Sequence, residues 1–262
     1  MLLSLVGVLP TTLLTASPTL PRLPLIHFKL NELLLPGESR ELHLESATEL
    51  SALDAAPSLL GSLITTPHNN ALTASSLLEV REVRRAENGV GAAVDVVAIG
   101  RMAIGHVDQD RFFEGSEITP IFDSQSARLS SDMALVEEYR SLARQHEELM
   151  QRLPAEEGRE DSSLDSAADL ARTELCAYDL DRAPATSLSR LYDLWDVSTE
   201  AAAELQLLSF AAFSSLSATH RSMALGMSSS ADRLGLAIRC LRKANQRAAA
   251  KLALIDAFAR TD

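Results

Sequence analysis

Apolar residues two positions apart mark several short stretches in the first half of the chain. The pairs are Ile26 and Phe28, Leu42 and Leu44, and Leu78 and Val80. A period of two is typical of a strand with one buried face. We therefore expect a strand at each pair, with a turn at Gly37 between the first two.

A tight hairpin is predicted farther along. Residues 78–84 form one strand, Asn88-Gly89 favours a short turn, and residues 92–98 form the returning strand. Residues 117–122 supply a last strand, where Pro120 indicates an edge position because proline has no N–H to donate. About six short strands in all favour a small twisted or barrel-like sheet. Between the strands, residues 48–60 predict a short helix that ends loosely at Pro57.

The spacing becomes helical after Asp123. Apolar positions recur at intervals of four and three in Leu135, Tyr139, Leu142, His146 and Leu149. Ser131 or Asp132 is expected to cap this helix, and Pro154 to follow its end. Further helices are expected at residues 164–178, 187–195 and 199–213.

The last predicted helix begins after residues 228–230 and has two contrasting faces. Its apolar face carries Leu234, Ile238, Leu241, Leu252 and Ile255, and its basic face carries Arg239, Arg242, Lys243 and Arg247. We expect the basic face to pair with acidic helices of the same chain rather than with a phosphate-rich partner. The second half is therefore predicted to be all-helical.

Charge and composition narrow the choice of partners. The chain has 262 residues, with 24 Lys and Arg against 36 Asp and Glu, so its net charge is −12. That charge repels phosphate backbones and anionic lipid surfaces, and an aromatic content of 4% leaves few rings for stacking on bases. Cys176 and Cys240 are too few for a disulfide framework or a zinc knuckle. Nucleic acid and membranes are disfavoured, and polypeptide partners remain open.

The first twenty residues carry no charged side chain. Their apolar run has the length of a signal-peptide core but lacks the preceding basic residues, and Pro10 interrupts it before it could span a bilayer. Two interpretations of residues 1–21 stay open: an apolar leader of no particular function and a targeting segment.

Motifs of familiar catalytic chemistry are incomplete. No GxxxxGK[ST] loop offers the phosphate cradle of an NTPase. Gly89-Val90-Gly91 has no third glycine and is expected to be a hairpin turn, while Gly226-Met227-Ser228 lacks the closing glycine of a nucleophile elbow and is expected to lie at a helix cap. The histidines never fall at metal-binding spacing, and Asp108-Gln109-Asp110 lacks the rest of a calcium loop. We expect no catalytic residue, no metal and no cofactor.

Several short motifs follow one another along the chain, and their shared order is more informative than any one of them. The first are Leu23-Pro24-Leu25, the turn at Pro36-Gly37 and the strand Leu42-His43-Leu44-Glu45. Residues 96–104, with Gly100 and Arg101, and residues 111–123, which close on Asp123, come next. In the helical half, residues 207–212 contain Ser209-Phe210, and residues 231–234 contain Arg233-Leu234. In this order the motifs resemble the N-terminal substrate-binding domain of Lon proteases.

The resemblance covers about residues 22–256 and implies a fold. An α+β chain is expected, with a leader at residues 1–21, an N-terminal PUA-like β pseudo-barrel at 22–123 and a C-terminal α-helical bundle at 124–262. Leu35 departs from the family, which usually has an aromatic residue in that turn. In full Lon proteases this module recognises substrates, and separate ATPase and protease domains follow it.

The resemblance also implies a function. We expect a stand-alone Lon-domain protein that binds unfolded or client polypeptide, is not an enzyme, and serves as an adaptor or regulator of a protease in protein quality control. Plastids are the expected location, with the cytoplasm as the alternative. Phe112, Phe113 and Trp195 are the candidate peptide-binding residues if they are exposed rather than in the core. The alternative function is that of a PUA-like RNA-binding protein, which the net charge disfavours.

Overall fold

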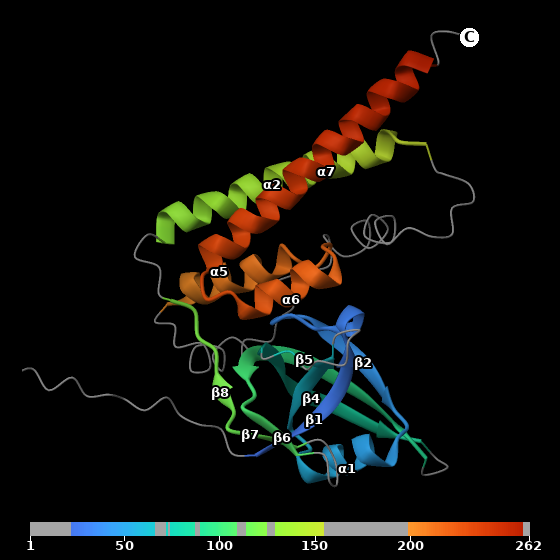
Figure 1. Ribbon diagram of the computed structural model, residues 1–262, viewed down its shortest axis with the longest axis vertical. Helices are drawn as coiled ribbons and strands as arrows, with labels where there is room; N and C mark the ends of the chain where they lie inside the picture. The colour runs from blue at the N-terminus through green and yellow to red at the C-terminus, as the bar shows by residue number, and fades with distance from the viewer. Residues whose placement is uncertain are drawn as a thin grey trace, which may run out of the picture.

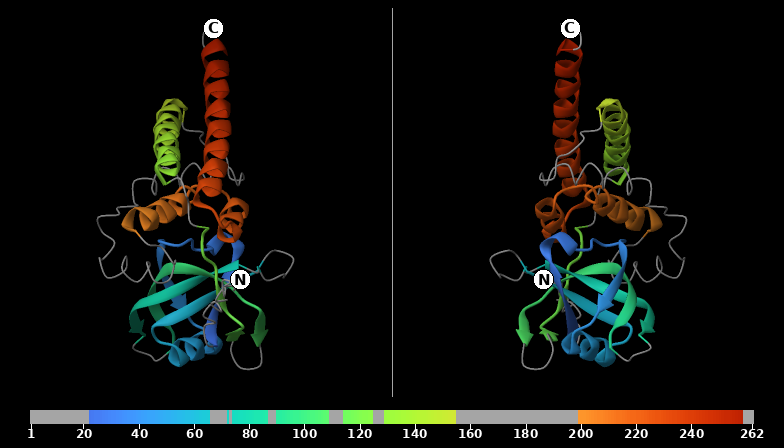
Figure 2. Two further views of the ribbon diagram at one scale, coloured as in Figure 1. Left: turned by 90° about the vertical axis from the view of Figure 1, so that its left-hand side faces the viewer. Right: turned by 90° about the vertical axis from the view of Figure 1, so that its right-hand side faces the viewer.

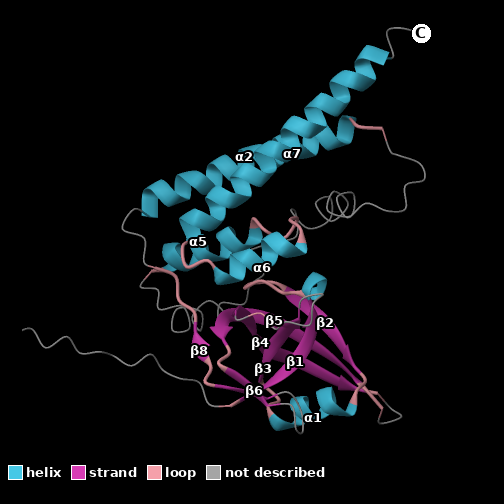
Figure 3. Cartoon of the chain, viewed as in Figure 1, coloured by secondary structure: helices cyan, strands magenta, loops and turns pink. Residues whose placement is uncertain are grey.

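The computed structural model describes residues 22–65, 72, 74–86, 90–108, 114–124, 129–154 and 199–258. Figures 1 and 3 show a strand-rich part, formed by the described residues between 22 and 124, below a helical part formed by the described residues between 129 and 258. Strands and helices are thus largely separate along the chain, and the predicted α+β class is confirmed. The PUA-like pseudo-barrel and the helical bundle stay predictions.

The strands form one sheet in the order β2-β5-β4-β3-β1-β7-β6, and β8 pairs with β5. Their bounds are β1 (Leu23–Lys29), β2 (Ser39–Leu44), β3 (Leu59–Thr65), β4 (Ala74–Arg85), β5 (Ala92–Ala103), β6 (His106–Asp108), β7 (Glu114–Ser116) and β8 (Thr119–Pro120). β1 runs parallel to β3, and the other pairs are antiparallel. The strands predicted from period-two apolar pairs are confirmed.

The short helix predicted within residues 48–60, with a loose end at Pro57, is confirmed, but its possible extension to Leu59 is wrong. Helix α1 (Ala47–Ala55) ends before Pro57, and Leu59 begins strand β3. β3 lies between β1 and β4 and is buried at five consecutive residues, from Leu60 to Ile64. A strand buried on both faces shows no alternation of apolar and polar residues, so the pattern could not reveal it.

β4 and β5 form the predicted hairpin. Arg85 pairs with Ala92, and the N–H of Ala86 donates to the carbonyl of Gly91 at 3.2 Å. Gly91 has a φ of +98°, which glycine adopts without strain. Asn88-Gly89 lies outside the described residues. Val90 and Gly91 therefore belong to a hairpin, as expected.

The described helices after Asp123 are α2 (Leu129–Arg152), α5 (Glu200–Ala211), α6 (Ala218–Gly226) and α7 (Ser230–Phe258). α5 and α6 lie next to the sheet, and the longer α2 and α7 extend away from it (Figures 1 and 2). Because α2 begins at Leu129, Ser131 and Asp132 lie within its first turn, and the predicted cap is wrong. α6 was not predicted. The helices expected at residues 164–178 and 187–195 lie outside the described residues.

α2 and α7 pack along their apolar faces. The buried residues of these faces are Val136, Tyr139, Leu234, Ile238, Leu241 and Leu252. At the same contact Asn245 donates from Nδ2 to the carbonyl of Leu142 at 3.0 Å, so its Oδ1 accepts from Nδ1 of His146 at 2.8 Å. The basic face of α7 is exposed, and Arg242 binds Glu138 of α2, in agreement with the expected intramolecular pairing.

One core joins the strands to the helices. Phe28 and Val94 of the sheet belong to the same buried cluster as Phe210 and Leu234 of the helical part. A second cluster on the sheet includes Leu207 of α5. Since α5 supplies both clusters, it fixes the helical part onto the strands. None of the described helices combines the length and the apolar character that a membrane span requires.

Candidate functional site

Two arginines and one aspartate meet where the strands contact the helices. Arg101 extends from β5, Asp123 follows β8, and Arg233 lies on α7. Asp123 Oδ1 accepts from Nη2 of Arg101 and, at 2.9 Å, from Nη1 of Arg233. Asp123 Oδ2 accepts from Nη2 of Arg233. All three side chains are at most 3% exposed, so we call them the buried charge joint.

Neighbouring groups complete the hydrogen bonds of the buried charge joint. Arg233 also donates from Nε to Ser209 Oγ (2.9 Å), from Nη1 to the carbonyl of Met227 (2.8 Å) and from Nη2 to Ser230 Oγ (3.0 Å). Arg101 donates from Nη1 to the carbonyls of Leu225 (2.8 Å) and Met227 (2.6 Å). The Phe210 ring lies under both guanidinium groups, with Cζ of Arg233 at 4.0 Å and Cζ of Arg101 at 5.2 Å from its centroid.

The joint keeps its charges despite its burial. Burial alone would raise the pKa of Asp123, but the hydrogen bond and charge of Arg233 and the charge of Arg101 outweigh it and lower that pKa. Burial lowers the pKa of Arg101 to about 10, against the opposing attraction of Asp123. Asp123 and Arg101 are therefore both charged at neutral pH. Since every nitrogen of Arg233 has a partner, the arrangement holds the helices on the sheet and offers no reactive group.

The motifs that the sequence showed in order converge at this joint. Arg101, Asp123 and Arg233 come from three of them, and Ser209-Phe210 comes from a fourth. Asp123 and Arg233 are separated by 110 positions. The sequence singled out each of these residues, but nothing in its local pattern indicated that they would meet.

A second ion pair joins the strands to α6. Arg221 donates from Nη1 to Glu38 Oε1 at 2.8 Å and from Nη2 to Glu38 Oε2 at 2.6 Å. Its Nη2 also donates to the carbonyl of Leu33 at 2.7 Å, and Glu38 accepts the N–H of Leu35 at 2.8 Å. The side chains are only 12% and 16% exposed. This pair therefore fixes the turn before β2 against α6, a helix that the apolar spacing does not predict.

Several histidine, aspartate and glycine residues that were candidates for a catalytic or metal-binding role lie in secondary structure or form local hydrogen bonds. His27 bonds Thr65 Oγ1 at 2.8 Å, His220 bonds Ser217 Oγ at 2.8 Å, and Asp108 lies on β6. Gly226 ends α6, and Ser229 Oγ accepts the N–H of Asp232 in the first turn of α7. Within the described ranges no three His, Cys, Asp or Glu side chains are placed to hold a metal ion. Burial raises the pKa of Cys240, which leaves its thiol protonated at neutral pH.

The candidate peptide-binding residues lie beyond the described part of the chain. Phe112 and Phe113 fall between β6 and β7, and Trp195 precedes α5. Large apolar side chains that are exposed in the structure come from other elements: Val83 and Val90 of the β4–β5 hairpin, Met223 of α6, and Leu254 and Phe258 of α7.

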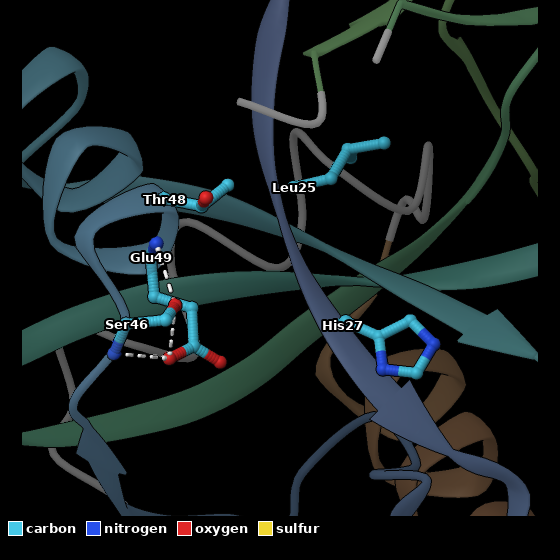
Figure 4. A pocket seen from close by; sticks show the side chains of 5 residues that line it. All are labelled: Leu25, His27, Ser46, Thr48 and Glu49. Atoms are coloured by element: carbon cyan, nitrogen blue, oxygen red, sulfur yellow. Dashed lines mark hydrogen bonds between the residues drawn. The ribbon is translucent and has the colours of Figure 1, made fainter. Parts of the chain in front are cut away.

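A hollow of about 350 Å³ lies between β1 and the start of α1. Figure 4 shows Leu25 and His27 on β1, with Ser46, Thr48 and Glu49 across from them. Ser46 and Glu49 form a capping box, in which Ser46 Oγ accepts the N–H of Glu49 at 3.1 Å and Glu49 Oε2 accepts the N–H of Ser46 at 3.2 Å. The rim of the hollow is therefore held in place by the helix cap.

Two Lon N-terminal domains are among the solved structures to which this chain is similar. The N-terminal domain of the Mycobacterium avium complex Lon protease is 19% identical, with a TM-score of 0.39 over 78% of this chain and 95% of that one. A Lon N-terminal domain protein from Xanthomonas campestris is 18% identical, with a TM-score of 0.39 over 83% of this chain and 96% of that one. No protein-family model and no curated protein matches the sequence.

Proposed function

We propose that this chain is a polypeptide-binding module without catalytic activity, resembling the substrate-recognition domain of Lon proteases. The observation that carries the proposal is the buried charge joint. Residues from four motifs that carry the resemblance meet there in one hydrogen-bonded cluster. Residues from all four motifs thus share one structural role, which is to fix the helices on the sheet.

The charge of the molecule supports polypeptide over RNA. Twelve excess acidic charges oppose the approach of a phosphate backbone, whose binding depends on lysines and arginines that release counterions. Among the described elements α7 carries the most arginines, and two of them are engaged within the chain: Arg233 with Asp123 and Arg242 with Glu138. An unfolded polypeptide needs no such excess of positive charge.

Client binding is tested with the full chain and a permanently unfolded protein. We expect reduced, carboxymethylated α-lactalbumin carrying a fluorophore to show saturable binding in fluorescence anisotropy, and the folded, disulfide-bonded form to bind at least tenfold more weakly. Poly(U) RNA is measured in parallel over a range of salt concentrations. Saturable, salt-sensitive binding of RNA without binding of the unfolded protein would replace the proposal by its alternative.

Two finer features belong to the same proposal. The module delivers clients to a protease as an adaptor, and it does so in plastids, with the cytoplasm as the alternative. A proteolysis assay in which the chain accelerates degradation of an unfolded client by a purified ATP-dependent protease tests the first. Fluorescence microscopy of the full chain fused at its C-terminus to a fluorescent protein tests the second.

A further inference from the structure

Strand β2 forms one end of the sheet. It pairs with β5 through six consecutive residues, from Ser39 opposite Val97 to Leu44 opposite Ala92. Among the described residues no strand pairs with its other edge. In an antiparallel strand every second residue directs both its N–H and its C=O away from its partner, so such an edge offers a row of hydrogen-bonding groups. The opposite end of the sheet, β6, has only three residues.

The edge of β2 is accessible and held in place. Glu41 and His43 are exposed on one face of the strand, while Leu42 is half-buried and Leu44 is buried on the other. Arg40 donates from Nη1 to the carbonyl of Glu32 at 2.7 Å, which anchors the start of the strand. An incoming strand would therefore meet a preformed partner and would not have to order it first.

The exposed face beside this edge is acidic. Glu41 lies opposite Asp95 of β5, which lies opposite Glu82 of β4, and Arg84 contacts all three carboxylates. Nε2 of His43 also lies 3.2 Å from Oε1 of Glu41. Glu41 and Glu82 remain 42% and 57% exposed. A strand added to β2 would place alternate side chains beside Glu41, where lysine or arginine is favoured.

The other face of β2, which carries Leu42 and Leu44, favours apolar side chains on an added strand. Leu44 belongs to the main core, and Leu42 packs against it. The remaining side chains of an added strand would extend this apolar surface, because successive residues of a strand point to opposite faces.

We propose that the free edge of β2 binds an extended polypeptide by strand addition, and that it selects segments in which basic and apolar residues alternate. This inference rests on the proposed polypeptide-binding function and names the surface and the kind of segment. Main-chain hydrogen bonds supply affinity that tolerates many sequences, and the acidic face supplies the preference for basic residues.

The test uses the full chain and a ten-residue peptide of alternating lysine and valine. A matched peptide carries N-methyl groups on all of its backbone amides, which removes the N–H donors of both edges, and another has glutamate in place of lysine. We expect saturable binding of the first peptide only, weakened by salt. Amide hydrogen exchange of residues 41–44 should slow when that peptide binds.

The variant Glu41→Lys probes the acidic face, with Glu137→Lys as its matched control. Both glutamates are exposed and contact an arginine, but Glu137 lies on α2 beside Arg140. We expect Glu41→Lys to weaken peptide binding about tenfold and Glu137→Lys to change it less than about twofold. Equal weakening by both variants, or equal binding of the N-methylated peptide, would overturn the proposal.

Binding of unfolded α-lactalbumin separates this inference from the function on which it rests. If that client binds while residues 41–44 exchange as fast as before, the module binds polypeptide elsewhere and the β2 proposal fails alone. If neither the client nor the peptide binds, both proposals fail. Slowed exchange of residues 41–44 with both ligands supports both.

Discussion

The carboxylate of Asp123 accepts hydrogen bonds from Arg233 on both of its oxygens, although 110 positions separate the two residues. Asp123 ends the strand-rich part and Arg233 lies in the first turns of α7. With Arg101 as a third member, this contact makes the strands and the helices depend on each other. It also carries a formal excess of one positive charge in the interior, which the carbonyls of Leu225 and Met227 and the ring of Phe210 help to accommodate.

The first prediction concerns removal of one partner from this joint. Arg233→Met keeps much of the side-chain volume but leaves Asp123 buried with fewer partners, and we expect it to lower the free energy of unfolding by about 3 to 5 kcal/mol. Urea unfolding at 25 °C measures it. Arg242→Met is the control, because the Arg242–Glu138 pair is exposed and should contribute less than about 1 kcal/mol. If Arg233→Met and Arg242→Met lowered the free energy of unfolding equally, burial of the charge joint would contribute no additional stability.

The second prediction concerns acid. The pKa of Asp123 is lowered in the folded state, so the stability that its ionised form contributes is fully present above the unfolded pKa of about 3.9 and is lost as the pH falls through the folded value. Asp123→Asn lacks this contribution at every pH. We therefore expect the difference in free energy of unfolding between wild type and Asp123→Asn to be largest at neutral pH and to narrow below about pH 4. A difference that stays constant down to pH 3 would contradict the assignment.

The third prediction concerns Glu38 and Arg221. Their two direct hydrogen bonds and low exposure give a coupling that exposed pairs lack. In a double-mutant cycle of Glu38→Gln and Arg221→Met, we expect a coupling energy of about 1 to 3 kcal/mol from urea unfolding. A coupling below about 0.5 kcal/mol would mean that α6 is held on the turn by its apolar contacts alone.

The fourth prediction concerns the polar pair between α2 and α7. Asn245→Ala leaves the N–H of His146 without its acceptor, and we expect it to cost about 1 to 3 kcal/mol. Replacing both residues with leucine removes both polar groups from the contact, so the double variant should be close to wild type or more stable. Thermal unfolding followed by circular dichroism compares them. A double variant that loses the sum of the single losses would show that the pair is needed beyond its hydrogen bond.

Local patterns were sufficient for the elements with one buried face. The alternation of Leu42 and Leu44 predicted β2, and the seam from Leu135 to Leu149 predicted most of α2. The pattern was not sufficient for β3, since a strand buried on both faces has no polar positions to mark its period. It also missed α6, a short helix of nine residues with two buried positions, Ala224 and Leu225, on which no repeating apolar spacing can be established.

The sequence by itself determined the α+β class, the hairpin at Gly91 and the apolar face of α7, because each depends on residues that are near neighbours in the chain. Only the tertiary structure decided that Arg101, Asp123 and Arg233 meet, and that no described strand pairs with the outer edge of β2, which acidic side chains border. These relationships depend on the packing of elements far apart in sequence. Burial then decides their energetics, since the same charges would interact only weakly if solvent surrounded them.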